Sequence, residues 1–251
     1  MSAVRICVVY PDLLGTYGDG GNGEILVMRA RWRGIDADLL LATSSDPLPP
    51  AELYCLGGGE DGPQVLAAER LRADGQLSRS VGDGAVVLAV CAGYQILGEA
   101  FPDASGSSHE GLGLFGLTTA KGTGPRAVGE VAAEVLAKSD GGLGLGALSG
   151  FENHGGLSQL APGTAPLARV LSGVGNGVDG TEGALVGRMV GTYLHGPVLA
   201  RNPELADQLL LWATGRAELD PLDDALAHDL RHERLASLSR ATNRGGGARP
   251  R

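Results

Sequence analysis

The sequence predicts an α/β fold with a mostly parallel central sheet and helices on both faces. Short apolar runs without strict polar alternation recur through the first 90 residues, which is typical of strands buried on both faces. Segments with apolar residues at helical spacing separate these runs, and strands that alternate with helices form parallel sheets. A chain of 251 residues is long enough to bury a substantial core in one domain.

The elements of the first half follow from these runs. Four apolar runs are predicted as buried strands: residues 4–9, 38–41, 53–56 and 85–90. The turn-rich stretch PDLLGTYGDGGNG leads into a predicted helix at residues 24–33, and a second helix is predicted at residues 63–73. The stretch YQILGEAF, shortly after Cys91, is predicted to continue as a helix.

The second half of the chain has a different pattern. RAVGEVAAEVLA fits a strand or a short helix, and a strand is favoured; LARVLSG and GALVGRMVGTYLH are also predicted as strands. Helices are predicted at residues 203–214 and 223–239. Without a repeat or a clear linker, we expect one domain over residues 1–242, followed by a frayed tail at residues 243–251.

Composition narrows the class of protein. A net charge of −9 with scattered basic residues argues against nucleic-acid binding, which needs clustered Lys and Arg. Three cysteines without metal-ligand spacing fit a reducing compartment with no disulfide framework and no zinc site, and Cys7 and Cys55 are predicted to be core residues. The N-terminal apolar run is too short for a signal peptide, and no run approaches about 18 apolar residues, so we expect a cytoplasmic protein with no membrane insertion.

Cys91 is a candidate nucleophile. In AVCAGYQ an apolar strand runs into Cys91, and Ala92 and Gly93 then allow a tight turn into a helix. Such a turn exposes the thiol and directs the helix N-terminus toward the sulfur, which favours the thiolate. A buried core cysteine at the end of a strand is the alternative interpretation of this local pattern.

The stretch LGGGEDGP is a candidate oxyanion hole. Gly57, Gly58 and Gly59 follow a predicted strand and expose backbone N–H groups at its carboxyl end, where parallel sheets bind ligands. With the N–H of Ala92 they could stabilise an oxyanion. An ordinary glycine turn is the alternative.

A histidine could complete the site. His195 ends the strand-like RMVGTYLH and stands before Gly196 and Pro197, as expected for a base at a strand terminus. His154 in GFENHGG is the second candidate, although a loop histidine bonded to backbone is the simpler interpretation of it.

Together the motifs carry a resemblance to a known family. YPDLLGTYGDGGN, LGGGED, AVCAGYQILG, GFENHGG and GTYLHGP, in this order and spacing, resemble class I glutamine amidotransferases of the cobyric-acid-synthase type. Within that group the chain is most similar to the glutaminase subunits of lipid II isoglutaminyl synthases, which work with a separate Mur-ligase-like subunit. The resemblance implies a class I amidotransferase fold, Cys91 as nucleophile, His195 as base and Arg126 as the residue that binds the α-carboxylate of glutamine. Arginine suits a bidentate grip on a carboxylate.

Two positions depart from the family pattern. Ala89 stands where many members have glycine, a change that we expect the turn to tolerate, and Pro197 stands where many place the third catalytic residue, a glutamate. Glu152 and Asp19 are candidates for that carboxylate within the chain. We also consider a carboxylate of the partner ligase, which predicts that glutaminase activity rises when the complex assembles.

The resemblance implies that the chain hydrolyses L-glutamine and passes ammonia to its ligase partner, which amidates the D-glutamate of the lipid II stem peptide. No GxxxxGK[ST] motif is present, so we expect no cofactor or metal in this chain, and ATP and Mg on the partner. Two alternatives remain: an amidotransferase subunit for another acceptor, such as a cobyrinate-type carboxylate, or an inactive amidotransferase-like scaffold.

Overall fold

The computed structural model describes residues 3–136, 145–177 and 179–245, and its centre is a six-stranded sheet. The strand order is β13-β14-β4-β3-β1-β2, and only the β13–β14 pair is antiparallel. The strands are β1 (Val4–Val9), β2 (Ala37–Ala42), β3 (Leu53–Leu56), β4 (Val86–Val90), β13 (Ala184–Val186) and β14 (Met189–Thr192). The predicted mostly parallel sheet is confirmed.

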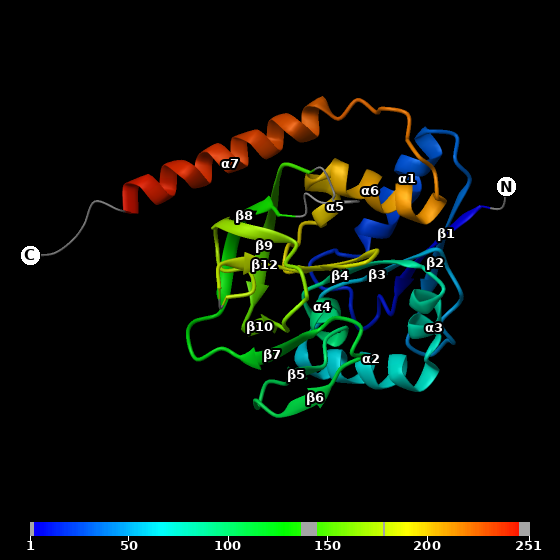
Figure 1. The fold of residues 1–251 in the computed structure, drawn as a ribbon, viewed down its shortest axis with the longest axis horizontal. Coiled ribbons are helices and arrows are strands. Elements are labelled where there is room, and N and C mark those ends of the chain that lie inside the picture. Colours follow the sequence, from blue (N-terminus) through cyan, green and yellow to red (C-terminus); the bar gives the residue numbers. More distant parts are fainter. Residues whose placement is uncertain (1–2, 137–144, 178, 246–251) are drawn as a thin grey trace, which may run out of the picture.

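Helices cover both faces of this sheet, as predicted (Figure 1). One face carries α1 (Gly21–Trp32), α5 (Val198–Arg201) and α6 (Pro203–Thr214). The other carries α2 (Asp61–Asp74), α3 (Gln76–Gly82) and α4 (Ala92–Ile96). The last helix, α7 (Ala225–Gly245), starts near α1 and runs away from it across the top of the molecule (Figure 1).

Two four-stranded sheets stand beside the central one. The first has the order β10-β7-β5-β6 and the second β12-β11-β8-β9. Their strands are β5 (Ala100–Pro102), β6 (Ser108–Glu110), β7 (Leu117–Lys121), β8 (Ala127–Val135), β9 (Ala147–His154), β10 (Gly156–Leu160), β11 (Ala168–Ser172) and β12 (Thr181–Glu182). Strand β8 confirms the choice of strand over helix for RAVGEVAAEVLA.

The prediction that YQILGEAF continues as a helix is wrong beyond Ile96. The carbonyl of Leu97 accepts hydrogen bonds from the N–H groups of Leu114 and Phe115, at 2.9 and 2.8 Å. At Gly98 a side chain would lie 2.9 Å from the carbonyl oxygen of Leu117. These contacts with a later segment turn the chain into strand β5, and helical spacing within the sequence cannot reveal them.

The limits of several other helices also differ from the sequence prediction. Helix α1 begins at Gly21, three residues early, and α3 was not predicted at all. Helix α7 continues through Gly245, so the predicted tail is helical over residues 243–245, while residues 246–251 lie outside the described part of the chain.

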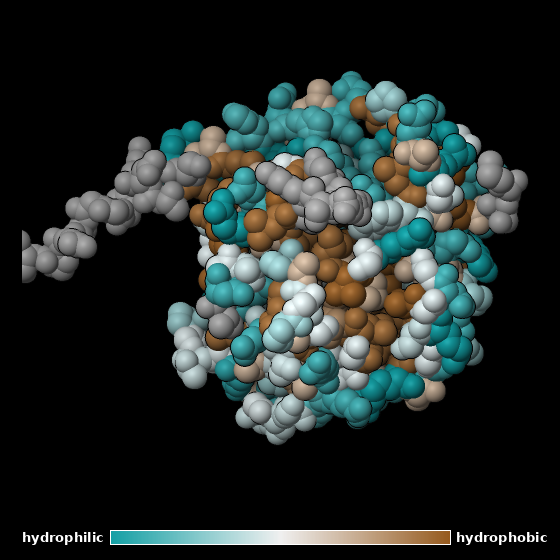
Figure 2. Space-filling model, in the orientation of Figure 1, coloured by the Kyte–Doolittle hydropathy of each residue, from teal (hydrophilic) through white to brown (hydrophobic). Residues whose placement is uncertain are grey.

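The core contains the central sheet and two of the cysteines. Every residue of β3 and β4 is buried, because helices cover both faces. Cys7 and Cys55 are buried and unpaired, which confirms the predicted core role, and burial raises the pKa of Cys7 to about 12. Figure 2 shows apolar side chains in brown at the centre of one face of the molecule, surrounded by polar groups in teal. No helix in the described ranges is long and apolar enough to span a membrane.

Candidate active site

Four segments that follow neighbouring parallel strands converge at one edge of the central sheet. Asp19 follows β1, the glycine loop follows β3, Cys91 follows β4 and His195 follows β14. Because these strands are neighbours and run parallel, their carboxyl ends meet at the same edge. The order of the strands therefore brings together residues that are far apart in the sequence.

Cys91 lies in a strained turn between β4 and α4. Its backbone has φ +51° and ψ −105°, a conformation that costs a non-glycine residue about 1 to 3 kcal/mol. Gly93 permits the turn, since a side chain there would meet the Cβ of Leu56 at 2.7 Å. The turn is present although Ala89, and not glycine, stands two residues before Cys91 in the preceding strand. The turn places Cys91 at the wall of a cavity.

His195 and Asp19 form a buried pair beside this turn. The Nδ1 of His195 lies 2.8 Å from Oδ2 of Asp19, and the two side chains are 1% and 0% exposed. The backbone of His195 exchanges two hydrogen bonds with Phe151, which fixes its position. Nε2 of the ring is buried and has no hydrogen-bond partner among the described residues, so it remains free to act on a thiol or a substrate.

The electrostatics of this pair favour the charged ring. Burial disfavours the imidazolium, but the hydrogen bond to Asp19 and the interaction with Cys91 outweigh it and raise the pKa of His195 to about 10. The charged ring of His195 therefore lies next to the thiol of Cys91.

The hypothesis that a partner ligase supplies the carboxylate is corrected by this geometry. Asp19 of the same chain already occupies Nδ1 of His195. The other candidate, Glu152, lies elsewhere: it accepts hydrogen bonds from the N–H groups of Val174 and Gly175, and one of its oxygens lies 3.4 Å from Nε2 of His154. His154 is therefore paired with Glu152 and lines the cavity with Cys91, but no hydrogen bond among the described residues joins it to His195 or Asp19.

The glycine loop matches its predicted role only in part. The N–H of Gly58 donates to Oδ2 of Asp19 at 2.9 Å, so the prediction that Gly58 contributes to an oxyanion hole is wrong. A side chain at Gly58 would lie 2.8 Å from Cε1 of His195, which makes this glycine a spacer beside the histidine. Gly59 and Ala92 line the cavity with Cys91, and neither N–H has an acceptor among the described residues.

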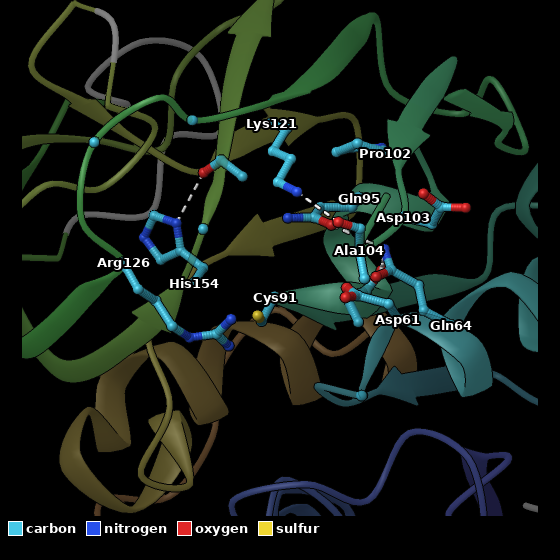
Figure 3. A pocket seen from close by; sticks show the side chains of 16 residues that line it. Asp61, Gln64, Cys91, Gln95, Pro102, Asp103, Ala104, Lys121, Arg126 and His154 are labelled. Carbon is cyan, nitrogen blue, oxygen red and sulfur yellow. Dashed lines mark hydrogen bonds between the residues drawn. The ribbon is translucent and has the colours of Figure 1, made fainter. Parts of the chain in front are cut away.

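Arg126 lines the same cavity of about 210 Å³ (Figure 3). Its Nη2 donates to the carbonyl of Asn153 at 2.9 Å and its Nε bonds the Asn153 side chain. Asn153 also bonds Tyr17, whose ring lies edge-on against His195 with centroids 4.8 Å apart. The structure thus brings Arg126 to the cavity that holds Cys91, and a chain of contacts links it to His195.

Two glutamines that the sequence analysis did not single out, Gln64 and Gln95, also line this cavity. Nε2 of Gln64 donates to Oε1 of Gln95 at 2.8 Å, and Nε2 of Gln95 donates to the hydroxyl of Tyr193 at 3.1 Å. Gln95 stands four residues after Cys91, one helical turn on, and that spacing was a signal in the sequence. Gln64 had no comparable signal, because α2 reaches the cavity only in the folded chain.

A thiol at a strained strand-to-helix turn, an imidazole and a buried carboxylate define the site as a Cys–His–Asp arrangement on an α/β sheet. Such a site can attack a carbonyl carbon and hold the oxyanion with the free N–H groups beside it. No group of three or more metal-ligating side chains occurs within the described ranges.

Comparison with protein families places this site in a known class. The model of the CobB/CobQ-like glutamine amidotransferase domain matches residues 5–203, which include every residue of the Cys–His–Asp arrangement. The chain belongs to this family.

Similar proteins and solved structures support the same family and the same fold. The chain is 30% identical over 239 residues to a lipid II isoglutaminyl synthase (glutamine-hydrolyzing) subunit GatD of Streptococcus pneumoniae, covering 92% of this chain and 90% of that protein. It is 36% identical over 203 residues to the protein of the same name from Staphylococcus aureus, covering 79% of each. A solved glutamine amidotransferase with 19% identity superposes with a TM-score of 0.56 over 83% of this chain and 98% of its own, which supports the fold.

Proposed function

We propose that this chain is a glutaminase that hydrolyses L-glutamine and supplies ammonia to a ligase subunit. The observation that carries the proposal is the buried contact of 2.8 Å between His195 and Asp19, next to Cys91 in its strained turn. A core cysteine would not need a left-handed backbone, a cavity and an adjacent histidine with a raised pKa.

The first half of the reaction forms a thioester. The Cys91 thiolate attacks the side-chain amide carbon of glutamine, and the carbonyl electrons move to oxygen, where the N–H groups of Gly59 and Ala92 stabilise the oxyanion. His195 gives its Nε2 proton to the departing nitrogen as the C–N bond breaks, and ammonia leaves.

The second half returns the enzyme to its starting state. His195, now neutral, accepts a proton from water as the water oxygen attacks the thioester carbon. The C–S bond then breaks, the thiolate returns and glutamate is released. Asp19 holds Nδ1 throughout, so that Nε2 faces the reaction, and Arg126 binds the α-carboxylate of glutamine through its guanidinium.

The names of the relatives support a particular ammonia acceptor. Both named relatives are subunits of lipid II isoglutaminyl synthase, and they align over 79% to 92% of this chain. We therefore propose a Mur-ligase-like partner that holds ATP and Mg and converts the α-carboxyl group of D-glutamate in the lipid II stem peptide to an amide.

Glutamate release tests the glutaminase itself. The purified chain, alone and with its ligase subunit, is incubated with L-glutamine, and glutamate is measured with glutamate dehydrogenase. We expect release that Cys91→Ala abolishes. Amidation of lipid II with glutamine should require both subunits, while amidation with ammonium chloride should need only the ligase. Absence of glutamate release from the intact complex would instead establish an inactive scaffold.

A further inference from the structure

Another hollow lies beside the segments that follow Asp19 and His195. It is a groove of about 490 Å³ between α1, α5 and the beginnings of α6 and α7. Figure 1 shows the start of α7 close to α1, and the groove opens between them. None of the residues proposed to act on glutamine lines it.

The wall that α1 contributes is apolar and uncovered. Ile25, Met28 and Trp32 follow the i, i+3, i+7 spacing of one helix face, and all three line the groove. Met28 is 42% exposed and Trp32 is 62% exposed. Leu226, at the start of α7, is 73% exposed. Exposed tryptophan and methionine beside a groove are typical of protein interfaces, where tryptophan often contributes most of the binding energy.

The rim of the groove is acidic. Glu24 lines it and is exposed, and its carboxylate forms no ion pair within the described residues. In the loop that leads into α7, the exposed carboxylate of Asp223 adjoins the lining residue Asp224 and forms no ion pair in the described part of the chain. The same loop also carries the exposed residues Arg216, Glu218 and Asp220, which do not line the groove. Among the lining residues of the groove Arg29 is a cation, but it is buried between Asp207 and Asp224 and is therefore already neutralised.

We propose that this groove binds an amphipathic segment of the ligase subunit, with an apolar side chain against Met28 and Trp32 and Lys or Arg facing the acidic rim. The proposal rests on the proposed function only in taking a ligase as the partner. The charge of the rim argues against a second copy of this chain as the binding partner, because the second copy would bring the same acidic rim and the two would repel each other. Helix α7 itself starts beside the groove and runs about 30 Å along its axis away from it, to Gly245 (Figure 1).

The groove lies close in sequence to both residues of the His195–Asp19 pair. Gly21 and Pro197 form part of its wall, and a side chain at Gly21 would meet Pro197 Cγ at 2.9 Å. Gly21 is two residues from Asp19, and Pro197 is two residues from His195. A partner seated here contacts both backbone segments that hold the His195–Asp19 pair. Docking in this groove therefore reaches the His195–Asp19 pair through these two backbone segments.

The test measures complex formation with three single variants. Trp32→Ala removes the exposed anchor and Glu24→Lys reverses the rim charge, while Leu171→Ala is the matched control, since Leu171 is 55% exposed on β11. The dissociation constant of each with the purified ligase subunit is measured by isothermal titration calorimetry at 50 and 300 mM salt. Glutamate release and thermal unfolding of each chain alone are measured in parallel.

We expect Trp32→Ala to weaken the complex by about 30-fold and Glu24→Lys by about 10-fold, the latter mainly at low salt. Leu171→Ala should stay within about threefold, and all three chains alone should keep their melting temperature and their basal glutaminase rate. Binding within threefold of the native chain for both groove variants overturns the proposal, as does a homodimer of the native chain that Trp32→Ala dissolves. If the native complex has no glutaminase activity, the proposed function is wrong, but the binding measurements still test the proposed groove.

Discussion

Asp19→Asn is the substitution that tests the catalytic pair most directly. The asparagine oxygen can take the place of Oδ2, which accepts from both Gly58 and His195, and its NH₂ group can take the place of Oδ1, which has no partner among the described residues. In that orientation the variant removes the negative charge and retains the hydrogen bonds. In the opposite orientation the NH₂ group faces Nδ1 of His195 and forces the wrong tautomer.

The structure gives the size of the effect. The pKa of His195, at about 10, lies above its ordinary value of 6.5, and at about 1.36 kcal/mol per pKa unit the difference is about 5 kcal/mol. Asp19 and Cys91 together supply this difference and also offset the opposing effect of burial, and a charged hydrogen bond contributes about 1.5 to 3 kcal/mol. Loss of about 2 to 3 kcal/mol lowers kcat/KM about 30- to 150-fold, and the wrong tautomer would extend the loss toward about 10⁴-fold.

Two assays check this prediction. Glutamate release gives kcat/KM, and NMR titration of the His195 ring should show its pKa well below about 10 in Asp19→Asn. Asp12→Asn is the matched control, because Asp12 precedes α1 on the same loop and its side chain, within the described residues, accepts hydrogen bonds from Ser44 alone. Activity of Asp19→Asn within threefold of the native chain, or an unchanged His195 titration, would refute the role given to Asp19.

Four further predictions follow from the same geometry. Cys91→Ser should abolish glutamine-dependent amidation and leave the ammonia-dependent reaction of the complex intact, because a hydroxyl is a poor nucleophile at neutral pH; near-native glutamine use would contradict this. Arg126→Ala should raise KM for glutamine about 30-fold or more with a smaller change in kcat, and an unchanged KM would return it to a surface role. Gly58→Ala should lower activity at least tenfold, since the added methyl meets His195 at 2.8 Å, while Gly62→Ala, with open space around it, should not. The pKa of His195 is higher in the folded than in the unfolded chain, so its contribution to stability is complete below about pH 6.5 and is lost as pH rises through about 10; denaturant titrations across this window should show the decline, which Asp19→Asn should flatten.

Local features of the sequence determined the main elements and identified the two candidate catalytic side chains. Apolar runs located β1, β3 and β4, because a strand buried on both faces must be apolar along its whole length. The small residues after Cys91 and the strand end at His195 identified both side chains, since turn chemistry depends on residues close in sequence. The resemblance of five short motifs to one family added Arg126.

The tertiary structure decided which carboxylate meets the histidine and which glycine N–H remains free. Asp19 and His195 are 176 residues apart, and their contact depends on β1 and β14 belonging to the same parallel sheet. The early end of α4 likewise depends on backbone contacts with residues 114–117. Periodicity and turn signals act over a few residues, whereas the partner of a buried charge is set by the order and direction in which distant strands pack.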